Sequence, residues 1–187
     1  MLNQVKMHVA EKYLSSHNAV TEWERKHFYD RLLWLFPLTF LCHIYEESHG
    51  FFIWVTHTLG GHMVEKVFYI NNACFVLLSF LLCWLCGRIR KPWPLSLLFF
   101  WVGAQEWWDA VFHIYEEYHL NTYSPGYFTS IFLYLPCYGY LSYLLIRERF
   151  LNRYFWLLTF LISPLALLFT IWAGLYHFQS FPWTLLF

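Results

Sequence analysis

The chain is dominated by apolar stretches that approach the length needed to cross a bilayer. They lie at 32–47, 67–86, 95–118, 127–146 and 154–176, and about 20 apolar residues are enough for a helix to span about 30 Å of hydrocarbon. The first is short and ends in polar residues. The sequence therefore predicts an all-α fold, a polytopic transmembrane helix bundle with about five spans.

The composition supports a location in a membrane and argues against a soluble or nucleic-acid-binding protein. The chain is 59% hydrophobic and 13% charged, whereas soluble domains carry about 25% charged residues. Its 12 Lys+Arg balance 12 Asp+Glu, so it lacks the basic surface that nucleic-acid partners need. We expect an integral membrane protein, in the inner (cytoplasmic) membrane if the host is bacterial, whose partners are the membrane and hydrophobic small molecules and not nucleic acid.

The basic residues predict how the spans are oriented. All but Lys66 fall before the first span, between the second and third, or between the fourth and fifth. The three clusters are Lys6, Lys12, Arg25, Lys26 and Arg31; Arg88, Arg90 and Lys91; and Arg147, Arg149 and Arg153. Short cytoplasmic loops carry the Lys/Arg excess, so we expect the N-terminus inside and the C-terminus outside.

The predicted spans divide the chain into three parts. Residues 1–26 form an N-terminal cytoplasmic or interfacial arm, 27–178 a transmembrane domain and 179–187 a C-terminal tail. Within the domain, 51–65 contains an apolar patch too short to cross, which favours a re-entrant or interfacial loop.

One segment occurs twice, 70 residues apart. Residues 42–49 read CHIYEESH and residues 112–119 read FHIYEEYH. Each copy ends a span that is predicted to run outward, so spans one-two and three-four are interpreted as a parallel internal repeat followed by a fifth helix. A two-fold axis along the membrane normal would bring the copies face to face.

The repeated residues are typical metal ligands. At 100° per residue, the histidine and both glutamates of each copy share one helix face. Four carboxylates without nearby Lys or Arg cannot all stay ionised, and in a bilayer they are costly. Either a divalent metal or metal pair neutralises them, or some are protonated and form a hydrogen-bonded network. The candidate ligands are His43, Glu46, Glu47, His113, Glu116 and Glu117.

The donor set leaves the metal open between zinc and iron. Two histidines and four carboxylates match the ligand count of carboxylate-bridged di-iron bundles, although the order His-x-x-Glu is the reverse of theirs. His and Glu ligands with one open position also suit a hydrolytic zinc. We therefore expect a divalent metal, zinc or iron, as one or two ions.

Further polar residues extend this predicted site. Glu106 and Asp109 continue the second copy's face inward, as ligands, a proton relay or a buried hydrogen-bonded set. The candidate catalytic residues are Glu47, Glu117, Glu106 and Asp109. Candidates for additional ligands, or for hydrogen bonds to the ligands, are His49, His119, His57, His62, Glu65 and Asn72.

The doubled H-x-x-E-E motif, with Asn121-Thr-Tyr-Ser-Pro-Gly126 after its second copy, resembles the family of small integral membrane proteins named after the HXXEE motif. The resemblance covers about residues 32–178. That family has no assigned function, so the resemblance implies a membrane location and adds no mechanism.

Three functions are compatible with these features. The leading hypothesis is a metal-dependent integral membrane enzyme with its site at the outer side, acting on a lipid or other hydrophobic substrate by hydrolysis with zinc or oxidation with iron. A metal or proton carrier would need polar groups through to the cytoplasmic end, where 95–102 offers only Ser96. The third is a non-catalytic assembly protein whose motifs staple the helices.

Overall fold

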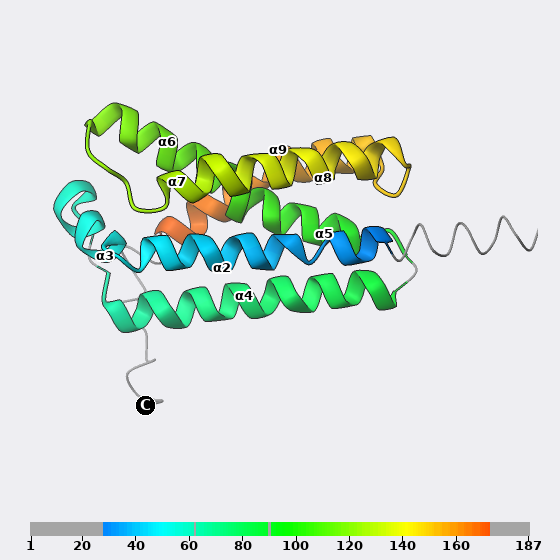
Figure 1. The fold of residues 1–187 in the computed structure, drawn as a ribbon, viewed down its shortest axis with the longest axis horizontal. Helices are drawn as coiled ribbons and strands as arrows, with labels where there is room; N and C mark the ends of the chain where they lie inside the picture. The colour runs from blue at the N-terminus through cyan, green and yellow to red at the C-terminus, as the bar shows by residue number, and fades with distance from the viewer. Residues whose placement is uncertain (1–27, 62, 90, 173–187) are drawn as a thin grey trace, which may run out of the picture.

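A computed structural model describes residues 28–61, 63–89 and 91–172. All regular structure within these ranges is helical (Figure 1), which confirms the predicted all-α class. The predicted arm 1–26 and tail 179–187 lie outside the described residues.

The first half of the fold is a pair of long helices joined by two short helical pieces. These elements are α2 (Leu35–Glu47), α3 (Phe51–Trp54), the π-helix η1 (Val55–Leu59) and α4 (Glu65–Arg88). The predicted loop at 51–65 is thus largely helical. Trp54 and Val55 are buried there against Phe112 and Ile171, so this connection covers one end of the bundle.

The second half consists of helical segments that change between α and π geometry. One runs from α5 (Trp93–Val102) through η2 (Gly103–Trp108) to α6 (Asp109–Leu120). The next comprises α7 (Tyr127–Thr129), η3 (Ser130–Tyr134) and α8 (Leu135–Arg147). The described chain ends with α9 (Arg153–Trp172). The π-helix η2 directly precedes α6, which carries the second motif copy, and η3 follows α7. Such π-helical turns often occur at functional sites.

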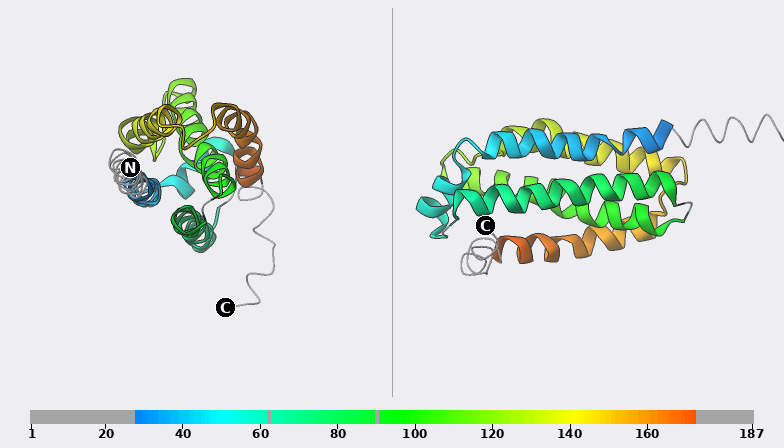
Figure 2. Two further views of the ribbon diagram at one scale, coloured as in Figure 1. Left: turned by 90° about the vertical axis from the view of Figure 1, so that its right-hand side faces the viewer. Right: turned by 90° about the horizontal axis from the view of Figure 1, so that it is seen from below.

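The long segments lie side by side and alternate in direction. The segments α2, α5–α6 and α9 run toward the end of the bundle that holds α3, and α4 and α7–α8 run back (Figure 1). In the view along the bundle, α5 lies between α4 and α9 (Figure 2), and both pack against it. The two motif copies, at the ends of α2 and α6, therefore lie at the same end.

Three segments are long and apolar enough to cross a membrane. They are Glu65–Arg88, Tyr127–Arg147 and Arg153–Trp172, which correspond to the predicted spans 67–86, 127–146 and 154–176. This is consistent with an integral membrane protein. Segments 28–47 and 93–120 carry the histidines and acidic residues of the motifs, which lower their hydropathy. Whether they cross too stays a prediction.

The end of the bundle remote from the motifs is a continuous apolar core. Phe36 is fully buried there, and its ring meets that of Phe99 edge to face with centroids 5.5 Å apart. Leu98, Leu141 and Tyr138 belong to the same buried cluster. This core holds α2, α5 and α8 together below the polar end.

We expect Phe36→Ala to lower the free energy of unfolding by about 3–5 kcal/mol, because it leaves a cavity in this core. Unfolding of the purified protein by a graded denaturing detergent measures the change. Leu38→Ala, on the same helix but 51% exposed, is the matched control and should change it by less than about 0.5 kcal/mol. Equal losses in both variants would contradict the assigned core.

Candidate metal centre

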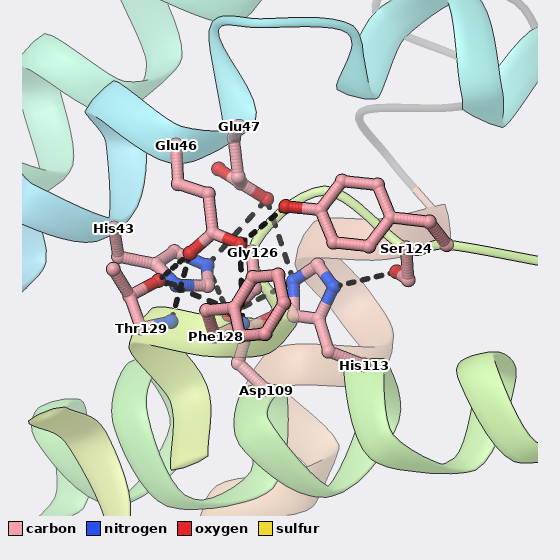
Figure 3. Close-up of polar contacts among 10 residues, drawn as sticks. His43, Glu46, Glu47, Asp109, His113, Ser124, Gly126, Phe128 and Thr129 are labelled. Atoms are coloured by element: carbon pink, nitrogen blue, oxygen red, sulfur yellow. Dashed lines mark hydrogen bonds and ion pairs between the residues drawn. The ribbon is translucent and has the colours of Figure 1, made fainter. Parts of the chain in front are cut away.

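The two motif histidines face each other inside the bundle. The ring centroids of His43, from α2, and His113, from α6, lie 5.0 Å apart at 69°, and the side chains are 1% and 0% exposed (Figure 3). The sequence predicted that the two motif copies lie face to face. In the structure, the histidines of the two copies are in contact.

Hydroxyl groups hold the outer nitrogen of each ring. His43 Nδ1 lies 2.8 Å from Thr129 Oγ1, and His113 Nδ1 lies 2.8 Å from Ser124 Oγ. Both Nε2 atoms therefore point toward the space between the helices, where they are buried without a hydrogen-bond partner. Each of these nitrogens nevertheless lies 3.1–3.6 Å from carboxylate oxygens of the chain.

Two carboxylates approach the same space. Glu47 Oε1 lies 3.6 Å from His43 Nε2 and 3.5 Å from His113 Nε2. Asp109 Oδ2 lies 3.1 Å and 3.6 Å from the same two nitrogens. Ligands bonded at about 2.0–2.1 Å to a tetrahedral zinc are separated by about 3.4 Å. Nitrogen and carboxylate donors at these spacings fit a divalent metal ion.

Of the six predicted ligands, three form one group. The donor atoms of His43, Glu47 and His113 all lie within 4.8 Å of one another, and all three residues are buried. The part of the chain that the structure describes has no other such group of three. Glu46, Glu116 and Glu117 lie outside it, so the geometry favours a single ion over a pair.

Glu46 binds the loop that follows the second motif copy. Its carboxylate accepts hydrogen bonds from the Tyr123 hydroxyl at 2.6 Å, from Phe128 N at 3.1 Å and from Thr129 N at 2.8 Å (Figure 3). Partial burial and the bond to Glu46 raise the pKa of Tyr123 above its usual value. The phenol therefore stays a donor.

Glu46 is also linked to His43 through Thr129. The Thr129 hydroxyl lies 2.6 Å from Glu46 Oε2 and 2.8 Å from His43 Nδ1. If the hydroxyl donates to Glu46, its oxygen accepts a hydrogen bond from His43 Nδ1, and Nε2 of the neutral ring then carries the lone pair that a metal needs.

Glu117, in the second copy, also binds the loop that follows this copy. Its Oε2 accepts a hydrogen bond from Ser124 N at 2.7 Å, and the hydroxyl of the same serine meets His113. Glu116 is half-buried next to it. Both glutamates of the second copy are therefore outside the metal group, in contrast to Glu47.

Gly126 is wedged against both imidazoles. It has φ +107, and a Cβ at this position would lie 2.7 Å from His43 Cε1 and 2.8 Å from His113 Nε2. Only glycine combines this conformation with such a close approach. Ser124, Gly126 and Thr129 were missed as site residues by the sequence analysis. The one signal for Ser124 and Gly126 was the turn-forming run 121–126 directly after the second motif.

The deeper acidic residue Glu106 lies apart from the metal group. It is buried, its Oε1 accepts a hydrogen bond from the Thr39 hydroxyl at 2.9 Å, and its Oε2 has no partner. Asp109 is thus the only one of the two inward acidic residues that reaches the histidines within 4 Å.

The remaining candidates lie around the site. His49 is exposed and its Nδ1 donates to the Tyr45 carbonyl at 2.7 Å. His119 is exposed and stacks on Tyr115. His57 and Glu65 are exposed, and His62 lies outside the described residues. Asn72 lines a pocket that Glu47 and Asp109 also line.

These features define an all-helical protein, apolar enough to span a membrane, with a buried His/Glu group that could hold a metal ion. A family model described as "protein of unknown function with HXXEE motif" matches residues 34–141. The match includes both motif copies and their loop and covers more than half of the chain. The chain therefore belongs to the HXXEE-motif family. Searches of curated proteins and of solved structures find no match.

We expect Gly126→Ala to weaken metal binding at least tenfold, because the methyl group displaces both imidazoles and strains the backbone. Titration of the metal-free protein with Zn²⁺, followed by calorimetry, measures the affinity. Gly139→Ala, where a Cβ meets nothing within 4 Å, should leave it unchanged. Unaltered affinity in Gly126→Ala would mean that the ion is not held between the two rings.

Proposed function

We propose that this protein is a metal-dependent integral membrane enzyme that acts on a lipid or other hydrophobic substrate. A single divalent ion is held by His43, Glu47 and His113. The observation that carries the proposal is the buried pair of Nε2 atoms, which form no hydrogen bond and lie with Glu47 in one group whose donor atoms are all within 4.8 Å of one another.

The donor set supports a catalytic site over a structural one. Two histidines and one glutamate are the ligands of hydrolytic zinc sites, which leave the fourth position to water. The same donors also suit Fe(II). A divalent ion bound here would lower the pKa of a water molecule and polarise a substrate carbonyl. Asp109, whose Oδ2 reaches the same space, is placed to take a proton from that water.

The apolar core supports an enzyme over a carrier. Between the metal group and the far end of the bundle lie Phe36, Leu98 and Phe99, which are fully buried. A carrier would need polar groups along this route to replace the hydration shell of an ion. The buried histidines and acidic residues of the described chain instead end at Glu106, which favours access to the site from one end.

The proposal includes a membrane topology. Segments 28–47 and 93–120 cross the membrane as well, the N-terminus is inside, and the metal site lies at the outer side. The alternating directions of the five long segments and the basic residues near Arg88 and Arg147 support this arrangement.

Reporters fused after Gly60 and after Tyr123 should therefore report the outer side, and those fused after Arg88 and after Arg147 the inner side. Paired fusions to a periplasmic-active phosphatase and to a cytoplasm-active fluorescent protein measure this. If 93–120 does not cross, the fusions after Arg88 and Tyr123 will report the same side.

The purified protein should contain about one equivalent of zinc or iron, which is lost in the double variant His43→Ala, His113→Ala, because the ion then keeps one ligand of three. Elemental analysis of protein in detergent measures the metal content and identifies the metal. Zinc would favour hydrolytic chemistry, and iron would favour oxidative chemistry. The double variant His57→Ala, His119→Ala removes two exposed histidines and should retain the metal. Wild-type protein that carries no metal and cannot be loaded would overturn the proposal.

Asp109→Asn should retain the metal, whereas Glu47→Gln should lose most of it, because only Glu47 is assigned as a ligand. The equivalents bound per chain, measured side by side, decide between the two roles. Loss of the metal in Asp109→Asn would identify a closed site with four protein ligands, which is the arrangement of structural zinc, and the enzyme proposal would fail.

A further inference from the structure

A pocket lies beside the metal group. It encloses about 100 Å³, and both Glu47 and Asp109 line it. Its other walls come from α3, α4, the η2–α6 segment and α9. A molecule in this pocket would therefore touch the ion that the proposed function places between His43 and His113.

The walls of the pocket combine apolar side chains with the polar residues Asn71, Asn72 and Thr170. The apolar residues include Phe68 and Phe75 from α4, Phe112 from α6, and Leu167 and Ile171 from α9. Both α4 and α9 are apolar enough to cross a membrane. These walls suit a hydrocarbon chain.

One polar group in the pocket has nothing to bind. Gln105 is 6% exposed, and its Nε2 is buried without a hydrogen-bond partner. It lies four residues before Asp109 on the same helical segment, so both side chains project to one face. A buried N–H without an acceptor is costly. An acceptor on a molecule bound in this pocket would satisfy it.

Resting on the proposed function, we propose that the substrate is a long-chain fatty-acyl ester or amide whose carbonyl oxygen accepts a hydrogen bond from Gln105 Nε2. The carbonyl end lies in the pocket beside Gln105 and Asp109, and the hydrocarbon chain lies against the apolar residues that α4 and α9 contribute to the pocket.

Hydrolysis of the ester or amide at this carbonyl needs water as its only second reactant. The oxygen of a water molecule bonds to the carbonyl carbon, and the bond from that carbon to the ester oxygen or amide nitrogen breaks. One proton of the water passes through Asp109 to the leaving atom, and a fatty acid is released. Gln105 keeps the carbonyl oxygen oriented while negative charge develops on it.

Photolabelling tests this assignment without an assay of activity. The probe is the methyl ester of palmitic acid with a diazirine at mid-chain, added to metal-loaded protein in detergent, and mass spectrometry locates the label. We expect label on α4 and α9 around the pocket, suppressed by excess unlabelled ester. Leu167→Trp, which fills the pocket, should reduce it at least tenfold. Leu168→Trp, on the exposed side of α9, is the matched control.

Gln105→Leu keeps the size of the side chain and removes the donor. It should raise the probe concentration for half-maximal labelling about five- to tenfold, and it decides the question if Leu167→Trp does not fold. Label that is spread over the helices and insensitive to both variants, in protein with its metal, overturns this inference and leaves the proposed function standing. Protein that binds no metal overturns both.

Discussion

Everything at the motif end of this protein depends on two buried imidazoles, whose Nε2 atoms form no hydrogen bond and lie 3.1–3.6 Å from two carboxylates. In a low-dielectric interior such atoms are costly unless something binds them. The fold keeps them in place through Thr129 and Ser124, which hold the opposite nitrogens. The apolar core below and the helical cap formed by α3 and η1 above leave this one polar group enclosed.

The duplicated motif does not produce a symmetric site. Glu47 belongs to the metal group, whereas its counterpart Glu117 binds the backbone of Ser124. Asp109 approaches the histidines from one turn inward, and the matching position in the first copy is Thr39, which binds Glu106 instead. Identical residues at identical spacing have thus acquired different partners because the loop 121–126 follows only the second copy.

Much of the fold could be predicted from the sequence, because helix positions follow from apolar runs. Predicted spans such as 67–86 and 154–176 correspond closely to α4 and α9. The meeting of His43 and His113 followed from the repeat. The role of Glu46 did not, because a helical wheel gives the direction of a side chain and not what lies there. The donors that hold Glu46 come from residues 123–129, and no periodicity reports such a distant contact.

The loop between the motif and α7 has a consequence for how the protein is made. His43 is synthesised 83 residues before Gly126, and His113 13 residues before it. Until the ribosome has delivered that loop, neither ring is oriented and no enclosed site exists. Assembly of the enclosed group formed by His43, Glu47 and His113 is therefore a late event in biogenesis.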